Sequence, residues 1–118
     1  MSDYDYIIVG AGSAGCVLAN RLSQDLSNKV LLIEAGGSDR RFFIQMPIGY
    51  GVTYHQKAVN WMYMTEPSPD ADNKPSYWPR GKVMGGSSSI NAMVYVRGNH
   101  KDFDQWANMG NPGWSYND

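Results

Sequence analysis

Three glycines that follow an apolar run constrain this chain more than any other feature. The run 6–9, Tyr-Ile-Ile-Val, leads directly into Gly10, Gly12 and Gly15, spaced as G-x-G-x-x-G. A strand, a tight glycine turn and a helix in this order are typical of a dinucleotide-binding site. The first glycine permits the turn, the second lets a pyrophosphate approach the backbone, and the third lets the helix pack closely on the strand. The pyrophosphate is then expected at the helix N-terminus, where free N–H groups and the positive end of the helix dipole meet.

The residues after the glycines supply the helix and the second strand that this motif requires. Residues 13–25 have apolar side chains at helical spacing, and the run 30–33, Val-Leu-Leu-Ile, is typical of a buried strand. Glu34 ends that strand, 24 positions after Gly10, close to the spacing of about 20 at which a carboxylate binds a ribose hydroxyl. An acid here disfavours a 2′-phosphate. The alternative is that Glu34 only ends the strand and faces water.

Composition argues against several classes of protein. The 118 residues are 42% apolar and 18% charged, which suits a packed core in one small domain. The net charge of −1 gives no electrostatic reason to expect nucleic acid or an anionic membrane as a partner. Cys16 is the single cysteine, so no intrachain disulfide can form and a reducing compartment is indicated. Following Gly15 on the helix, Cys16 is expected to be a small packing residue without a redox role.

The two ends of the chain carry further expectations. No apolar run approaches the roughly 20 residues that span a bilayer. Residues 1–5 are acidic and lead at once into the first strand, so we expect no secretory signal and a cytoplasmic location. An open parallel sheet needs several strand–helix units, and only one and a half are visible before the turn-rich run 111–118. We therefore expect this chain to be the N-terminal part of a larger protein.

The middle of the chain has weaker signals. Residues 42–54 have a mixed pattern, for which we expect a short helix or an irregular surface segment. Residues 60–65 alternate and are rich in aromatic side chains, which predicts a strand. Residues 66–75 contain three prolines and three acids and form a loop, after which residues 76–79 are candidates to pair back on that strand. Residues 102–109 resemble a short amphipathic helix, with an apolar face of Phe103, Trp106 and Ala107.

Residues 80–91 form a second glycine-rich cluster. It contains the pair Gly85-Gly86, three following serines and two preceding cations. Backbone N–H groups in such a turn form an anion-binding concavity, but the lysine precedes the glycines, so the cluster is not a P-loop. The alternative is a flexible serine-glycine linker. Against it, Ile90 and the apolar residues 93–96 follow immediately, so we expect the segment to enter a buried region.

At this second cluster the sequence resembles the glucose-methanol-choline family of flavin oxidoreductases, close to its choline-dehydrogenase-like members. The run 79–91, followed by two acids before Trp106, is similar to a signature of that family and is far more specific than G-x-G-x-x-G. Met84 stands where leucine is usual, which is a volume-conserving exchange. The resemblance covers essentially the whole chain and is carried by residues 5–19, 30–36, 65–67, 79–91 and 95–98.

The resemblance implies an α/β fold, with residues 1–118 as the N-terminal portion of a Rossmann-like FAD-binding domain. It implies FAD rather than NAD, with Glu34 on the adenosine ribose. Some members link FAD covalently through a histidine where this chain has Ile90, so we expect a non-covalent cofactor. The residues that the resemblance places at the pyrophosphate are Gly10, Gly12, Ser13, Ala14 and Gly15, and those that it places along the flavin are Val83, Gly86, Ser87, Asn91, Met93 and Val94.

The implied reaction is oxidation of an alcohol to an aldehyde or ketone by hydride transfer to the flavin. The family's catalytic base and substrate domain lie far beyond these residues in longer chains. His55 and His100 are the only histidines here, and neither matches the motif of that base, so we expect surface or structural roles for both. This leaves two alternatives: an FAD-binding fragment without activity of its own, or a hydroxynitrile lyase on the same fold. The alcohol and the electron acceptor are not specified by these residues.

Overall fold

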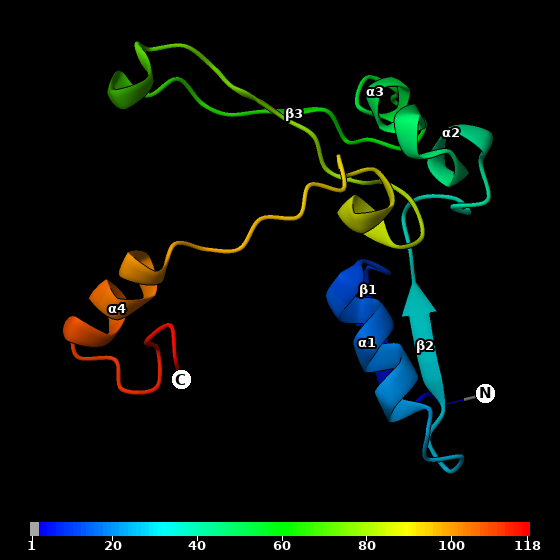
Figure 1. The fold of residues 1–118 in the computed structure, drawn as a ribbon. Coiled ribbons are helices and arrows are strands. Elements are labelled where there is room, and N and C mark those ends of the chain that lie inside the picture. The colour runs from blue at the N-terminus through cyan, green and yellow to red at the C-terminus, as the bar shows by residue number, and fades with distance from the viewer. Residues whose placement is uncertain (1–2) are drawn as a thin grey trace.

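The computed structural model describes residues 3–118, and its N-terminal unit is a parallel strand–helix–strand. Strands β1 (Tyr6–Val9) and β2 (Val30–Ile33) pair in parallel, and helix α1 (Ser13–Leu22) connects them (Figure 1). Both predicted strands are confirmed with the predicted bounds. The helix ends at Leu22 rather than at residue 25, because Asn28 Nδ2 donates to the Leu22 carbonyl at 2.9 Å and ends the helical hydrogen-bond pattern there.

The turn between α1 and β2 is held by Asp25. Its carboxylate accepts hydrogen bonds from the Ser27 hydroxyl at 2.7 Å and from the Ser27 N–H at 3.0 Å. These bonds, the hydroxyl first, lower the pKa of Asp25 from its usual value. The same turn brings Lys29 N–H within 2.8 Å of the Asp5 carboxylate, so the chain enters β2 beside the start of β1.

Short helical turns fill the segment for which the sequence predicted a short helix or irregular structure. They are α2 (Phe42–Gln45), the 3-10 turn η1 (Pro47–Gly49) and α3 (Tyr50–Thr53). Pro47 begins η1, a position where its missing N–H costs no hydrogen bond. Gly49 is buried, and a Cβ there would overlap the Phe43 backbone, so the absence of a side chain lets α2 and α3 fold tightly together.

A narrow ribbon follows, as the alternation predicted. Strand β3 (Tyr63–Met64) pairs antiparallel with β4 (Tyr77–Trp78), and the 3-10 turn η2 (Pro69–Ala71) lies in the loop between them. The predicted pairing is confirmed, but β3 is shorter than residues 60–65. The backbone of Met62 has φ 57°, which breaks the extended conformation before β3 begins. Figure 1 shows this ribbon reaching away from β1, α1 and β2.

The core is small and lies where the second glycine-rich cluster packs on α2 and on the segment before β3. Val59 and Val83 are fully buried, Ile90 is nearly so, and Ile44 of α2 packs against them. Asn60, 1% exposed, lies beside this cluster with its amide fully used. Asn60 Nδ2 donates to the Tyr54 carbonyl at 2.8 Å and the Tyr77 hydroxyl at 3.1 Å. Asn60 Oδ1 accepts from Met62 N–H and Arg80 N–H, both at 2.9 Å.

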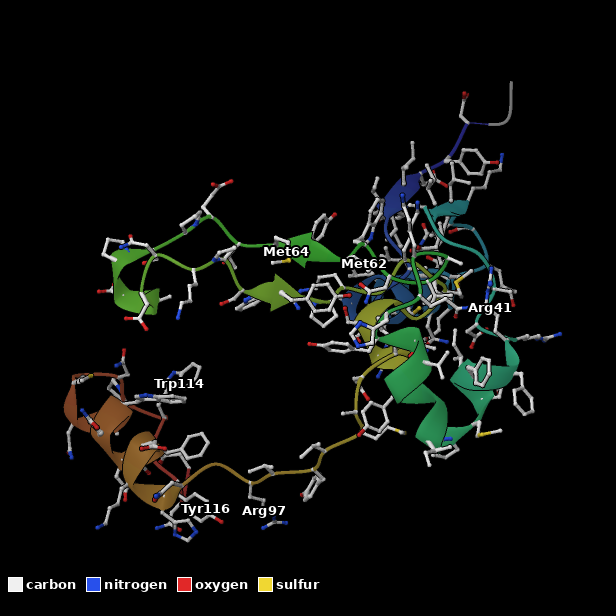
Figure 2. All side chains as sticks on the ribbon, turned by 90° about the horizontal axis from the view of Figure 1, so that it is seen from above. Arg41, Met62, Met64, Arg97, Trp114 and Tyr116 are labelled. Carbon is white, nitrogen blue, oxygen red and sulfur yellow. The ribbon has the colours of Figure 1, made fainter. Side chains whose placement is uncertain are left out.

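The expectation that the chain enters a buried region after the second cluster is confirmed for Ile90 and wrong for residues 93–96. Residues 91–99 have no regular secondary structure, and Val94, Tyr95 and Val96 are 76%, 82% and 78% exposed. Figure 2 shows Arg97 on this segment, between the core and the C-terminal helix. Met93 is partly covered, beside α2 and α3, and the three apolar residues after it are mostly exposed. The Cα radius of gyration is accordingly 18.8 Å, against about 13 to 14 Å for a compact domain of this length.

Helix α4 (His100–Asn108) forms a separate end of the molecule with the residues that follow it. It begins two residues before the predicted start at 102, because Asn99 Oδ1 accepts from Lys101 N–H at 3.0 Å and caps the helix. The rings of Phe103 and Trp106 pack edge to face with their centroids 5.0 Å apart, and those of Trp106 and Trp114 do the same with their centroids 6.0 Å apart. In Figure 2, Trp114 and Tyr116 lie beside this helix, away from the core.

Within residues 3–118, no helix is both long enough and apolar enough to cross a lipid bilayer.

Candidate functional site

The first glycine loop leaves room for an anion at the start of α1. Gly10 has φ +96° and makes the turn out of β1, and Gly15 packs on the Gly10 carbonyl, where a Cβ would overlap it. A Cβ on Gly12 would meet nothing within 4 Å, so the space in front of this residue is open. Helix α1 has no side-chain cap and no acid in its first turn. The first N–H groups of the helix have no intrahelical acceptor and are available to an anion.

Glu34 holds the first loop from the end of β2. Its Oε2 accepts a hydrogen bond from Ala11 N–H at 2.7 Å, and its Oε1 accepts one from Gly36 N–H at 2.8 Å. The alternative that this acid faces water with only a strand-ending role is therefore wrong. Each carboxylate oxygen has a second lone pair, so a ribose hydroxyl can still be bound, and that role stays a prediction.

The second glycine cluster forms a hydrogen-bonded turn that contacts the first loop. Gly85 N–H donates to the Ala11 carbonyl at 2.7 Å, and a Cβ on Gly86 would lie 2.9 Å from Gly12 Cα. Gly85 and Gly86 have φ +87° and +60°, conformations that favour glycine. In Figure 1 the turn, coloured yellow, lies next to the start of α1.

Serine hydroxyls fix the shape of this turn, η3 (Gly86–Ser89). Ser88 Oγ donates to the Gly85 carbonyl at 2.6 Å, and Ser89 Oγ donates to the Met84 carbonyl at 2.7 Å. Ser87 Oγ accepts from Gly81 N–H at 3.0 Å. Because all three hydroxyls bond to the local backbone, the alternative of a flexible serine-glycine linker is wrong.

A cleft of about 520 Å³ lies where the two loops and Glu34 meet. It brings together five of the residues predicted from the sequence, and its walls include the carboxyl ends of β1 and β2. That edge of a parallel sheet is where nucleotides bind in this class of fold. The predicted residues that line it are Gly10, Gly12, Glu34, Gly86 and Ser87.

Trp61, Tyr63 and Arg80 also line the cleft, although the sequence did not assign them to a site. The Trp61 and Tyr63 rings stack with their planes at 4° and their centroids 5.9 Å apart. Lys82 Nζ lies 4.6 Å from the centre of the Trp61 ring, on which it makes a cation–π contact. The sequence shows two aromatic residues at a spacing of two, but strand alternation does not account for their stacking, because Met62 between them has φ 57°.

The other predicted site residues lie elsewhere, and their assignment stays a prediction. Val83 is fully buried in the core. Asn91 and Met93 line a separate cavity of about 200 Å³ beside α2 and α3. Val94 lies on the exposed extended segment. Among the first-loop residues, Ser13 and Ala14 are exposed at the start of α1, and Gly15 is buried in the first turn of the same helix.

The remaining reactive side chains lie outside the cleft. His55 is exposed and lies 4.8 Å from the Tyr54 ring, and exposed His100 stacks on Tyr116, so both have the surface positions that were expected. Cys16 Sγ donates to the Ala11 carbonyl at 3.3 Å and packs behind the loop. Residues 3–118 contain no group of three or more His, Cys, Asp or Glu side chains that could hold a metal ion.

Comparison with known proteins identifies what this arrangement is similar to. The family model described as GMC oxidoreductase matches residues 4–118. An oxygen-dependent choline dehydrogenase from Vibrio vulnificus is 56% identical over 96% of this chain and 20% of its own length. An alcohol dehydrogenase [acceptor] from Pseudomonas putida is 52% identical over 96% and 20%. The crystal structure of pyridoxine 4-oxidase from Mesorbium loti superimposes with a TM-score of 0.78, at 38% identity over 98% of this chain and 23% of that one. The chain thus spans about a fifth of the length of the curated relatives it matches.

Proposed function

Because this chain belongs to the GMC oxidoreductase family, we propose that it is the N-terminal FAD-binding part of an enzyme that oxidises an alcohol to an aldehyde or ketone. The observation that carries the proposal is the cleft in which both glycine loops and Glu34 meet. FAD is the cofactor of the family, and when bound it accepts a hydride from the alcohol carbon. The fold, an α/β fragment of a Rossmann-like FAD-binding domain, fits this cofactor.

The cleft supplies the groups that the adenosine diphosphate half of FAD requires. Open space at Gly12 and an uncapped helix N-terminus suit a pyrophosphate, which would be held by the N–H groups of Ser13, Ala14 and Gly15. Glu34 has lone pairs left for ribose hydroxyls. The stacked rings of Trp61 and Tyr63 give a nucleobase an aromatic wall in the same cleft.

The flavin half would lie toward the second cluster, along the residues that the family resemblance assigns to it. Ile90 stands where some members attach FAD through histidine. It is 6% exposed and packs in the core with Val59 and Val83, and its aliphatic side chain offers no nucleophile. We therefore expect the flavin to leave the protein on acid precipitation. Flavin that stays in the protein pellet would contradict this part of the proposal.

The residues described here bind and orient the cofactor, and the catalytic base is proposed to come from sequence outside this chain. Neither histidine lines the cleft, and a base must come within hydrogen-bond reach of the hydroxyl proton that it removes. The names of the relatives support an alcohol as the substrate class. The single cysteine supports a reducing compartment, so a cytoplasmic location is part of the proposal.

The proposal is tested on the protein expressed from its complete natural reading frame. The purified protein is expected to be yellow and to show flavin absorbance bands. Anaerobic addition of primary alcohols, choline among them, should bleach those bands as the flavin is reduced. Reoxidation in air, compared with reoxidation by an artificial dye, then separates oxidase from dehydrogenase behaviour. Bound flavin that no alcohol reduces would favour a binding module or a lyase, and a colourless protein that takes up no FAD would overturn the proposal.

A further inference from the structure

The backbone of Ala11 connects three parts of the site. Ala11 is fully buried, and both of its backbone polar groups are used. Its N–H donates to Glu34 Oε2 at 2.7 Å, and its carbonyl accepts from Gly85 N–H at 2.7 Å. One residue of the first loop is thus bonded on one side to the end of β2 and on the other to the second loop.

We propose that Glu34 is a positioning residue that fixes both glycine loops before any cofactor binds. A carboxylate accepts a stronger hydrogen bond than a neutral group does, and the two hydrogen bonds of Ala11 are coupled through the position of its backbone. The bond from Ala11 N–H to the carboxylate therefore sets the position of Ala11, whose carbonyl in turn anchors Gly85. Gly36 N–H, bonded to the other carboxylate oxygen at 2.8 Å, holds the carboxylate in place.

Because the two loops are in contact, the position of Ala11 affects both of them. Gly86 lies so close to Gly12 that a single added carbon would be 2.9 Å from Gly12 Cα. A shift of the first loop must therefore be matched by the second. Without Glu34, the Ala11 N–H would be left buried without its acceptor, and an unsatisfied buried donor favours a rearranged loop. The two halves of the cofactor site would then lose their common anchor.

Hydrogen–deuterium exchange, measured by mass spectrometry on the flavin-free protein from the complete reading frame, tests the proposal. The variant is Glu34→Gln, which keeps the shape of the side chain but can accept with only one of its two end groups. The matched control is Glu66→Gln, an exposed acid in the loop after β3. We expect peptides covering residues 10–16 and 83–90 to exchange about tenfold faster in Glu34→Gln. Peptides covering 50–60 should be unchanged, and Glu66→Gln should match the parent protein throughout.

Exchange that rises in 10–16 alone, or in neither peptide, would overturn the proposal. A loss of FAD affinity with unchanged exchange would leave Glu34 as a ribose contact only. If Glu34→Gln exchanges faster in every peptide, the second variant is Glu34→Asp, which keeps the charge but has a shorter side chain. Faster exchange confined to the two loops in Glu34→Asp supports the proposal. Faster exchange in all peptides of Glu34→Asp contradicts it. This inference rests on the proposed function only where it names FAD as the cofactor. A parent protein that binds no FAD but shows the two-loop effect would refute that function and leave the positioning role standing.

Discussion

Gly86 shows how a single residue can decide whether the two halves of the site fit together. Its backbone has φ +60°, and a Cβ would press on Gly12 Cα. Gly86→Ala therefore has two costs. A left-handed conformation costs a non-glycine residue about 1 to 2 kcal/mol, and the added Cβ clashes with the Gly12 backbone. We expect Gly86→Ala to purify with much less flavin and to melt at a lower temperature than the parent protein.

The control for this prediction is Gly113→Ala. Gly113 also has positive φ, +82°, but a Cβ there meets nothing within 4 Å. It should retain flavin at the parental level when absorbance at the flavin bands is compared with that at the protein band. Equal flavin loss in both variants would show that backbone strain, rather than contact between the loops, is responsible.

Trp61 is the residue whose role the cleft adds to the sequence interpretation. Stacking of a base on an aromatic side chain contributes about 1 to 3 kcal/mol, so we expect Trp61→Leu to weaken FAD binding about tenfold or more. Trp114→Leu is the control, because Trp114 is an exposed tryptophan that contacts Trp106 of α4 and does not line the cleft. Flavin fluorescence titration gives both affinities. An equal or larger loss of affinity in Trp114→Leu would contradict this position for the base.

At the scale of elements, Asn60 joins the β3–β4 ribbon to α3. Its four hydrogen bonds connect the Tyr54 carbonyl, the Tyr77 hydroxyl and two backbone N–H groups. Asn60→Ala leaves the Met62 and Arg80 N–H groups without their acceptor, whereas the Tyr54 carbonyl keeps its hydrogen bond from the Tyr77 hydroxyl at 2.6 Å. Unsatisfied buried groups cost about 1 to 3 kcal/mol each. We expect the free energy of unfolding to fall by about 2 kcal/mol or more.

Urea denaturation of the protein from the complete reading frame, monitored by tryptophan fluorescence, measures this change. The matched variant is Asn20→Ala, because Asn20 is an exposed residue of α1 and alanine favours helices. Its unfolding midpoint should equal or slightly exceed that of the parent protein. Similar midpoints for the two variants would show that the Asn60 network does not stabilise the fold.

At the scale of the whole molecule, the chain exposes much of its apolar surface. Ile7, Val9 and Leu18 are 61%, 84% and 51% exposed on the strand–helix–strand unit. The core contains few side chains, and a small buried area rarely offsets the conformational entropy of folding. We expect the 118-residue chain expressed alone to bind a hydrophobic dye such as ANS and to unfold without a sharp transition.

The protein from the complete reading frame is the comparison for that experiment. It should bind little dye and show a cooperative melt by differential scanning calorimetry. A sharp melt of the isolated chain, with no dye bound, would show that these residues form an independent folding unit.

Local sequence was enough to predict the parts whose hydrogen bonds and packing are local. The bounds of β1 and β2 follow from apolar runs with glycine or charged neighbours, and the glycine turn follows from its spacing. The end of α1 was not predictable to the residue, because Asn28, beyond the helix, bonds back to Leu22. Residues 93–96 have the apolar pattern of a buried segment, yet burial depends on neighbouring elements, and Val94, Tyr95 and Val96 remain more than three-quarters exposed.

The sequence alone determined the type of site, since glycines at fixed spacing, a carboxylate at the end of the second strand and the second glycine cluster each have a local chemical reason. Tertiary structure alone decided how they combine. It placed Gly85 on the Ala11 carbonyl, Glu34 on the Ala11 N–H, and Trp61 and Tyr63 in the same cleft. These contacts join residues 23 or more positions apart, and no pattern within one segment specifies which distant backbone group a hydrogen bond will meet.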